Sequence, residues 1–477
     1  MMGLESDCLL WRAVNDPESL PPVDAFTQSK FDAGHEVGEL AKQLYPEGVD
    51  LDGLGFMENI NKTKELVLDR KTIFEAGFMI DGLFARSDIL IPVGDSYDVI
   101  EVKSSSSAKD AHIKDLAFQK FVLEKAGLQT RNFSVVHLNK EYVLDGKLSV
   151  QGLFAQTDVT EEVLEEFPSV SDNVNHMKEV ISLDTCPAFD YHDIVKSAYG
   201  NPCIDEFNDS LPSGSIFELY RIQKKKALSL LDEGCYVLSE IPSSFKLTSK
   251  QKIQVNCFNT KSRHIDARNI ELFIQNLQYP LYHLDFETFM PTIPLYDGCK
   301  PNQQIPFQYS LHVEQEDGSV SHYEFLFTGE GDPRKEFLAS LKNDLGTKGT
   351  VLVYHQVFEL GRLKELAAFD STYVDWVDSV LLRVTDLIVP FREFYFYDNR
   401  QKGSCSIKYV LPVFSELDYK SLAVSNGSEA MMLYYTHFVK GVACSDRSQL
   451  VTDLLAYCKQ DTWAMVLLLR GLKEMVK

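Results

Sequence analysis

The chain has 477 residues and a formal net charge of −23, because 70 Asp and Glu outnumber 47 Lys and Arg. Its hydrophobic fraction of 44% and charged fraction of 25% are ordinary for a folded protein, and they exclude a disordered or collagen-like chain. The acidic balance argues against a protein that coats nucleic acid non-specifically through a basic surface. It is compatible with an enzyme whose carboxylates gather where metal ions bind.

The sequence also bears on the cellular compartment. It contains no apolar run of the roughly 18 residues needed to cross a bilayer, and no basic region precedes an apolar stretch at the N-terminus. The nine cysteines are odd in number, and none forms a CxxC pair. We therefore expect a cytoplasmic protein without a membrane partner and without a disulfide framework.

The N-terminal block, residues 1–165, has a mixed pattern of helix and strand. Apolar positions in FDAGHEVGELAKQLY recur at helical spacing, whereas DILIPV and YDVIEVK have the composition of short strands. A second helical pattern, DLAFQKFVLEKAG, ends at Gly127 and precedes the strand-like run SVVHLN. This order of elements predicts an α/β domain.

Two carboxylates and a lysine in this block suggest a metal site. Asp88 lies in one expected strand, while Glu101 and Lys103 lie two residues apart on the next and share a face. A hairpin through PVGDS would bring Asp88 to Glu101. Two carboxylates at ~4 Å repel by about 4 kcal/mol at an effective dielectric constant near 20. A divalent cation between them attracts both, so the repulsion is replaced by metal binding. The alternative is a strand-end aspartate beside an exposed Glu–Lys pair, since short E-x-K matches are common.

The middle of the chain, residues 166–270, alternates acidic and basic clusters. IFELYRIQKKKALSLLDEG looks helical up to Gly234, so we expect a helical extension and connector. RIQKKKALS and SKQK are the densest basic patches of the chain. They either cradle a nucleic-acid backbone or form solvated helix faces.

The C-terminal block, residues 271–477, begins with strand-like runs and ends in a helix, which predicts a second α/β domain. Asp285 and Glu287 in YHLDFETF share one strand face, and Tyr457 and Asp461 lie one turn apart on an apolar helix. A carboxylate in so apolar a helix is costly without a partner. A metal ion shared with the strand acids would supply one. The alternative is a packed tyrosine and a capping or solvent-facing aspartate.

A loop-like segment, GSCSIKYVLP, separates these two motifs along the chain. It offers Ser404, Ser406 and Lys408 ahead of an apolar run. These side chains either contact a phosphate or belong to a turn that is followed by packing.

Four motifs of the N-terminal block follow the order helix, strand, strand and helix: His35, Asp88, the E-x-K run 101–103 and Gln119. This order resembles the RecB-like branch of the PD-(D/E)XK nucleases over about residues 8–125. The resemblance implies that Asp88 and Glu101 bind a metal ion, with His35 contributing to the site. It also implies that Lys103 activates water or contacts the phosphate and that Gln119 positions DNA.

Two further positions bear on this resemblance. The branch often carries a tyrosine one turn after the glutamine, where Leu123 stands in this chain, and this departure weakens the expectation of substrate-strand contact. Glu75, in TIFEAGF, is an additional candidate acid.

A subset of the RecB-like branch holds an iron–sulfur cluster with one N-terminal cysteine and a closely spaced downstream trio. Cys8 resembles the N-terminal ligand. The downstream cysteines are widely separated, at Cys186, Cys203, Cys235 and Cys257. SAYGNPCIDEFND looks like a place for such a trio, but other residues stand where thiolates are needed. We therefore expect no cluster, and cysteines that pack as small apolar residues.

The D-x-E strand that opens the C-terminal block and the Y-x-x-x-D helix that closes it resemble the tyrosine variant of the DEDD exonucleases, which have an RNase H-like fold. That family places another acid after an apolar strand, and VLVYHQVFELGRLKEL fits with Glu359 in place of the usual aspartate. Asp386 is a second candidate. The resemblance implies that the acids hold two Mg2+ or Mn2+ ions at a phosphodiester and that Tyr457 orients the attacking water.

Together the two blocks resemble a bacterial family of predicted two-nuclease proteins, through segments such as IPFQYSLHV, FELGRL and YCKQDT. We expect a metal-dependent nuclease that hydrolyses DNA at two active sites, in repair, recombination or defence. Two alternatives stay open. One is a nucleic-acid-binding scaffold with one or both sites decayed, and the other is RNA processing by the C-terminal domain.

Overall fold

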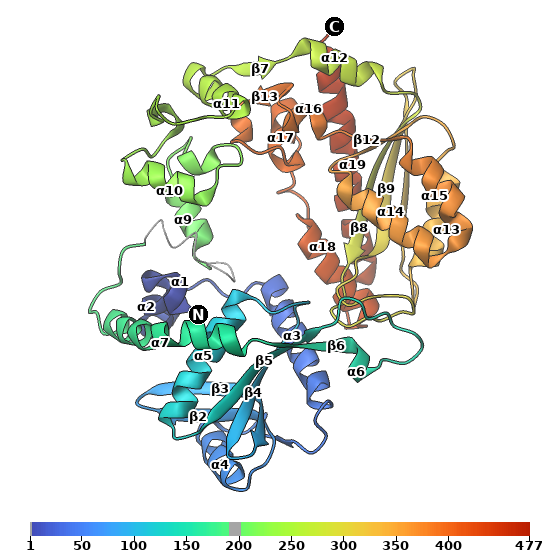
Figure 1. Cartoon of the computed structure of the whole chain (residues 1–477). Coiled ribbons are helices and arrows are strands. Elements are labelled where there is room, and N and C mark those ends of the chain that lie inside the picture. Colours follow the sequence, from blue (N-terminus) through green and yellow to red (C-terminus); the bar gives the residue numbers. More distant parts are fainter. Residues whose placement is uncertain (1, 190–201) are drawn as a thin grey trace. The chain divides into compact units, whose positions relative to one another are not determined.

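The computed structural model describes residues 2–189 and 202–477, which form two compact units (Figure 1). Unit 1 comprises Met1–Asp209 and Pro291–Gln303, and unit 2 comprises Ser210–Met290 and Gln304–Lys477. Each unit contains a central sheet with helices packed on it. The mixed α/β class predicted from the sequence is therefore confirmed.

Unit 1 is built on a six-stranded sheet in the order β1-β2-β3-β4-β5-β6. The pairs β1–β2 and β4–β5 are parallel, and the other neighbours are antiparallel. The strands are β1 (Val49–Asp50), β2 (Ile73–Ile80), β3 (Leu83–Val93), β4 (Ser96–Lys103), β5 (Thr130–Leu138) and β6 (Phe154–Asp158). The helices are α1 (Met2–Glu5), α2 (Asp7–Asn15), α3 (Ala25–Lys42), α4 (Phe56–Leu68), α5 (Asp110–Lys125), α6 (Val150–Leu153), α7 (Thr160–Ile181) and α9 (Ile204–Ser210).

Helices cover both faces of this sheet because its strands are apolar on both sides. Ile89 and Ile100 point to one face, where they pack in a cluster with Val37 of α3. Their neighbours Leu90 and Val99 point to the other face, where they pack with residues of α5 and α7. Successive side chains of a strand alternate between faces, so one continuous apolar run supplies both cores.

The β3–β4 hairpin has the predicted form. The two strands are antiparallel, Val93 pairs with Ser96, and Gly94 adopts a left-handed φ of 53° in the turn. Ile89 pairs with Ile100. Asp88 and Glu101 are therefore neighbours across the hairpin, as expected from the sequence.

One segment of unit 1, Pro291–Gln303, comes from the connection that follows β8 in the sequence. The backbone amide of Leu144 donates to the carbonyl of Cys299 at 2.9 Å. Ile293 packs on the same apolar cluster as Ile100. The core of unit 1 is thus completed by residues distant in sequence.

Unit 2 contains a five-stranded sheet in the order β10-β9-β8-β11-β12 and a small sheet of β7 and β13. β8 pairs antiparallel with β9 and parallel with β11. The strands are β7 (Arg263–Ile265), β8 (Leu281–Phe289), β9 (Ile305–Glu314), β10 (Val320–Leu326), β11 (Thr350–Val353), β12 (Val384–Asp386) and β13 (Phe396–Asp398). The helices are α10 (Lys224–Asp232), α11 (Ser249–Thr260), α12 (Ala267–Gln275), α13 (Arg334–Asp344), α14 (Val357–Phe369), α15 (Val374–Leu381), α16 (Val389–Arg392), α17 (Ile407–Phe414), α18 (Gly427–Tyr434) and α19 (Arg447–Glu474).

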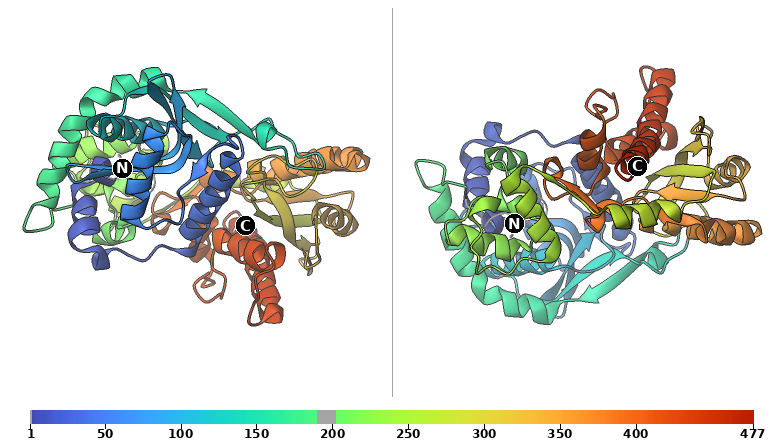
Figure 2. Two further views of the ribbon diagram at one scale, coloured as in Figure 1. Left: turned by 90° about the horizontal axis from the view of Figure 1, so that it is seen from below. Right: turned by 90° about the horizontal axis from the view of Figure 1, so that it is seen from above.

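Alternation along β8 determines which way its acids face. Tyr282, Leu284 and Phe286 point into the apolar cluster formed with α13, α14 and α15. The intervening Asp285 and Glu287 therefore point to the opposite face. Figure 2 shows the red helix α19 on that face, across the yellow strands from the orange helices.

The connector differs from the predicted long helix. In IFELYRIQKKKALSLLDEG only Lys224–Asp232 forms an α-helix, and Ile216–Glu218 forms a 3-10 turn. Arg221 has a left-handed φ of 49°, which an α-helix of L-residues does not accommodate, so the helix cannot run through it. At the other end, α7 continues across residue 165, and unit 1 extends to Asp209.

Within residues 2–189 and 202–477, the helices lack the combination of length and apolar character that a membrane span requires.

Candidate active sites

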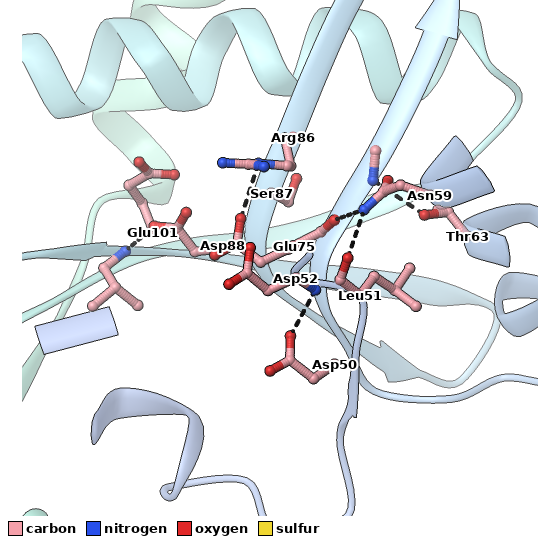
Figure 3. Close-up of polar contacts among 12 residues, drawn as sticks. Asp50, Leu51, Asp52, Asn59, Thr63, Glu75, Arg86, Ser87, Asp88 and Glu101 are labelled. Carbon is pink, nitrogen blue, oxygen red and sulfur yellow. Dashed lines mark hydrogen bonds and ion pairs between the residues drawn. The ribbon is translucent and has the colours of Figure 1, made fainter. Parts of the chain in front are cut away.

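The first candidate site lies on the β3–β4 hairpin of unit 1 (Figure 3). The backbone amide of Val102 donates to Asp88 Oδ2 at 2.7 Å, which fixes this carboxylate against β4. Lys103 Nζ donates to Glu101 Oε1 at 2.5 Å and lies 3.7 Å from Asp115 Oδ2 of α5. The structure therefore brings together the aspartate, glutamate and lysine that the sequence pattern singled out.

Burial controls the charges of this cluster. Burial raises the pKa of Asp88 to about 6, although Lys103 and the bound amide oppose the shift. Burial and then the charge of Asp88 raise the pKa of Glu101, which is 3% exposed. Burial alone would lower the pKa of Lys103, but Glu101 and Asp88 outweigh burial and raise it. The site is a buried and a half-buried carboxylate beside a charged ammonium, an arrangement that gains from a further cation.

Gln119 supports Glu101 from α5. Its Nε2 donates to Glu101 Oε2 at 2.7 Å, and its Oε1 accepts a hydrogen bond from the Ser87 hydroxyl at 2.8 Å. The side chain is buried, at 3% exposure. Both ends of the amide are used inside the protein, and the expected contact of Gln119 with DNA stays a prediction. Gln119 orients a candidate metal ligand.

His35 has different neighbours from those predicted. Its ring, Glu39 and Asp52 offer ligand atoms that all lie within 4.8 Å of one another, and all three residues are exposed. In the described part of the chain no hydrogen bond joins His35 to Asp88 or Glu101. The histidine thus belongs to an exposed group with Glu39 and Asp52, and its contribution to a metal site with Asp88 and Glu101 stays a prediction.

Glu75 lies opposite Asp88 where the β2–β3 pairing is interrupted. Its sequence neighbours pair with the residues on either side of Asp88, while Glu75 adopts a left-handed φ of 57°. This left-handed backbone interrupts the regular pairing at Glu75 without shifting the strand register. Arg86 Nε lies 2.9 Å from Glu75 Oε2, so this additional candidate acid already has a cationic partner.

The candidate cluster cysteines are partly gathered. Cys8 and Cys186 approach to 3.5 Å between their sulfur atoms, and Arg12 donates to the sulfur of Cys203 at 3.5 Å. Burial and then the contact with Cys186 raise the pKa of Cys8 to about 12, which keeps it a thiol. Residues 197–201 of the segment considered for the trio lie outside the described residues, and the expectation of no iron–sulfur cluster stays a prediction. The two remaining positions are buried in unit 2: Cys235 and Cys257.

The second candidate site lies between β8 and α19 of unit 2. Ligand atoms of Asp285, Glu287 and Cys458 lie within 4.8 Å of one another. The charge of Asp461 raises the pKa of Asp285 and Glu287, so the helix acid faces the strand acids. A Cβ on Gly427 would lie 3.6 Å from Glu287 Oε2 and 3.8 Å from the Tyr457 hydroxyl, so these two groups approach one point. The predicted strand pair and helix pair therefore meet.

The carboxylates of this site repel one another in a buried space. Burial and then Asp461 raise the pKa of Glu287 to about 8 and hold that of Asp285 well above its ordinary value. Burial raises the pKa of Asp461 to about 6, although hydrogen bonds from Tyr419 and Tyr457 favour its charged form. Such a group of carboxyls favours protonation or a positive charge beside it.

Glu359 contributes to the same site from the first turn of α14. It is 2% exposed, and its Oε2 has no hydrogen-bond partner among the described residues. Burial raises its pKa to about 8, and its charge in turn raises the pKa of Asp285. A buried and unpartnered carboxylate oxygen is costly, which makes this position suitable for a metal ligand.

Asp386, the second candidate for the further acid of this site, contacts the backbone of a turn. Its Oδ1 accepts hydrogen bonds from the backbone amides of His355 at 2.9 Å and Ile388 at 3.2 Å. Arg392 lies 3.4 Å from its Oδ2. His355 has a left-handed φ of 81°, so Asp386 stabilises the turn that leads from β11 into α14.

Sequence analysis missed one side chain of this site, Tyr419, and considered another, Lys408, only as an alternative. Tyr419 donates from its hydroxyl to Asp461 Oδ1 at 2.6 Å. Lys408, considered above as a phosphate contact, lowers the pKa of Glu287 and Asp461 through its charge. The stretch around Tyr419 has no regular apolar period, so no sequence pattern could place it. Ser404 Oγ accepts from the amide of Ser406 at 3.1 Å, as in a turn.

The basic patches lie on helices of unit 2. RIQKKKALS runs into α10, and SKQK forms the first turn of α11. Lys250 Nζ lies 2.7 Å from Glu393 Oε2, so part of the second patch is already paired.

Comparison with known proteins gives a domain and three relatives. Residues 282–406 match a domain of unknown function (DUF2779). This stretch includes Asp285, Glu287 and Glu359 and ends before Tyr457 and Asp461. The matched domain therefore contains only part of the second candidate site.

The relatives come from Ureaplasma and Mycoplasma species. "Uncharacterized protein UU173" of Ureaplasma parvum is 26% identical over 244 residues, covering 46% of this chain and 35% of the relative. "Uncharacterized protein MG366 homolog" of Mycoplasma pneumoniae is 22% identical over 351 residues, covering 65% and 52%. "Uncharacterized protein MG366" of Mycoplasma genitalium is 23% identical over 250 residues, covering 48% and 37%. The chain thus spans about half or less of the length of these relatives.

Proposed function

We propose that this chain is a metal-dependent nuclease that hydrolyses phosphodiester bonds of DNA, with one active site in each unit. The observation that carries the proposal is the set of carboxylates that β8, α14 and α19 bring into one electrostatic environment: the buried Glu287 and Glu359 and the half-buried Asp285 and Asp461. Burying several like charges together is unfavourable unless cations or protons neutralise them. The sequence resemblances favour phosphodiester hydrolysis as the use of such a site.

The donor set fits Mg2+ or Mn2+. Carboxylate oxygens are the ligands that these ions prefer. The unpartnered Oε2 of Glu359 is a donor atom that the protein itself leaves unsatisfied. When bound, a pair of such ions supplies a nucleophilic water and stabilises the leaving oxygen.

The surrounding side chains have roles that follow from their contacts. Tyr457 presents its hydroxyl near Glu287, and the charge of Asp461 acts on it, a position from which it orients the attacking water. Its own pKa is raised by burial and then by Asp461, so it acts as a neutral hydrogen-bonding group.

The site in unit 1 supports the same activity. Asp88 and Glu101 supply the acids, Lys103 remains charged beside them, and Gln119 restrains Glu101. Lys103 Nζ is held between Glu101 and Asp115, where it would contact a phosphate oxygen or polarise water.

Cleavage assays with separate variants test the proposal. The full chain would be incubated with labelled single- and double-stranded DNA and RNA in Mg2+ or Mn2+. Lys103→Ala and Asp461→Ala each remove one site, and the exposed Lys140→Ala and Asp375→Ala serve as matched controls. We expect cleavage that requires the metal and falls in at least one site variant but in neither control.

Two results would contradict the proposal. Binding of nucleic acid without cleavage would favour the scaffold alternative, most clearly if the affinity falls steeply with salt. Cleavage of RNA alone, lost in Asp461→Ala, would favour RNA processing by unit 2 and would refute DNA as the substrate.

A further inference from the structure

The site in unit 2 includes two side chains besides the four acids and Tyr457: the phenol of Tyr419 and the ammonium of Lys408. Tyr419 is 8% exposed and donates to Asp461 Oδ1 at 2.6 Å. Lys408 Nζ lies 5.3 Å from the centre of the Tyr419 ring. Tyr457 lies nearby, with a ring centre 6.3 Å from that of Tyr419. Asp461 is thus approached by two tyrosines from different parts of the chain.

The segment that carries Tyr419, residues 415–426, connects α17 to α18 and is held in place around the site. Gln460 Nε2 of α19 donates to the carbonyl of Asp418 at 2.7 Å. Lys408 Nζ donates to the carbonyl of Ser425 at 2.9 Å. These bonds fix the segment on both sides of Tyr419, so its hydroxyl is directed at Asp461 by the fold.

The bond between Tyr419 and Asp461 restrains one oxygen of a candidate metal ligand. A carboxylate held by a neighbouring donor keeps its orientation and leaves its remaining lone pairs for a metal ion. Hydrogen-bond partners of this kind commonly change metal affinity or activity about 10–100-fold when removed. Tyr419 therefore has the geometry of a positioning residue.

Lys408 is suited to bind an anion. The residue is exposed at the start of α17, and its Nζ makes one hydrogen bond with a backbone carbonyl. Its charge reaches Glu287 and Asp461 without forming an ion pair with either among the described contacts. An accessible ammonium beside metal-binding acids is a point charge of the kind that contacts phosphate oxygens.

We propose that Lys408 binds the phosphate group of a nucleotide at the unit 2 site and that Tyr419 positions Asp461 for metal binding. This inference rests on the proposed function. It names the phosphate group as the substrate feature recognised there, and it assigns roles to two residues beyond the acids and Tyr457.

The test of Lys408 measures binding, with thymidine 5′-monophosphate as the probe. The full chain carries Asp88→Asn, so that the unit 1 site contributes less to the titration. In calorimetry with Mn2+ present, Lys408→Met should weaken probe binding about 10-fold or more, as expected for loss of a charged hydrogen bond. The affinity for Mn2+ should stay within about twofold. Lys420→Met, at an exposed lysine of the same segment, is the matched control, and Lys408→Arg should retain most of the binding.

The test of Tyr419 measures metal affinity in the same background. Tyr419→Phe removes only the hydroxyl and should weaken Mn2+ binding about 10–100-fold. Cleavage by this variant should recover as Mn2+ is raised, a response that a purely structural defect would not show. Tyr409→Phe, at an exposed neighbouring tyrosine, should change neither quantity.

The outcomes distinguish failure of the inference about Lys408 and Tyr419 from failure of the nuclease proposal on which it rests. If Lys408→Met binds the probe as well as Lys420→Met does, or if Tyr419→Phe binds Mn2+ like the parent, the inference is overturned while the nuclease proposal stands. If the parent binds no Mn2+, both are overturned.

Discussion

Gln119 donates a 2.7 Å hydrogen bond to Glu101 in the core of unit 1, with its other end bonded to Ser87. The bond exists because α5 follows β4 directly and packs back over the same sheet. Through this bond, a residue expected at the DNA surface supports a candidate metal ligand. A buried polar network of Ser87, Gln119 and Glu101 thus helps to orient the candidate site of unit 1. Loss of one member of such a network leaves its partners buried without hydrogen bonds.

Replacing Gln119 with Leu should therefore affect both stability and cleavage. The change leaves Glu101 Oε2 and the Ser87 hydroxyl without their partner, which should cost about 1–3 kcal/mol in the free energy of unfolding. Cleavage that depends on Lys103 should fall about 10–100-fold, because the carboxylate is no longer held. Chemical denaturation and assays in an Asp461→Ala background measure the two effects. Gln151→Leu, at an exposed glutamine of α6, should be neutral, and an equal loss there would contradict the prediction.

The unit 2 acids predict a metal-dependent pH response. The pKa of Glu287 is raised from 4.5 to about 8 in the folded protein. A raised carboxyl pKa means that its contribution to stability is fully present below the unfolded value and is lost as the pH rises through about 8. The melting temperature of the metal-free chain should therefore fall between about pH 4.5 and pH 8.

Calorimetry at these pH values, in EDTA and in excess Mn2+, measures this response. Mn2+ should reduce the decline, since the ion neutralises the carboxylates that protons otherwise occupy. Glu287→Gln should flatten the decline in EDTA, while Glu330→Gln, an exposed glutamate of unit 2, should leave it unchanged. A slope that is the same with and without Mn2+ would argue against metal binding by these acids.

The sequence predicted the local elements of both sites well, since they depend on short-range rules. Strand alternation placed Asp285 and Glu287 on one face, and helical spacing placed Tyr457 near Asp461. The turn at Gly94 produced the expected hairpin. Each of these relations spans only a few residues, or a single turn, of the chain.

The parts that could not be predicted depend on long-range packing. The segment of Tyr419 meets α19 across 42 residues, and nothing in its local composition indicates that contact. Arg86 pairs with Glu75 at a position of left-handed backbone, which strand alternation alone does not predict. The burial of Gln119 likewise follows from how closely α5 packs on the sheet.

A row of histidines across three strands predicts acid sensitivity of unit 2. His283 pairs with His312, and His312 pairs with His322, on the strands β8, β9 and β10. Burial lowers the pKa of His312 to about 3 and that of His322 to about 4. A depressed pKa means that the stability contribution is present above the unfolded value of 6.5 and is lost as the pH falls towards the folded value.

Burial is the main reason why these rings stay neutral, and the charged groups around them define the test. Lys459 of α19 faces both His312 and His322, Glu314 of β9 lies 3.4 Å from His283, and Glu324 of β10 lies 3.9 Å from His322. We expect the stability advantage of the parent over His312→Gln to shrink between about pH 7 and pH 5, as measured by urea unfolding. An advantage that stays constant over this range would show that His312 does not titrate on unfolding. His437→Gln, at a histidine outside this row, is the control.

Ile293 provides the last prediction, because it follows β8 in sequence yet packs in the core of unit 1. Ile293→Ala should destabilise unit 1 by about 1–2 kcal/mol, less than the full cost of a buried isoleucine because the residue is only partly buried. Hydrogen exchange should accelerate in β5 and α3 and stay unchanged in β9. Ile265→Ala, at an exposed isoleucine of β7, should alter neither set of amides. Faster exchange confined to β9 would mean that the connection after β8 stabilises its own sheet instead, and that unit 1 folds without it.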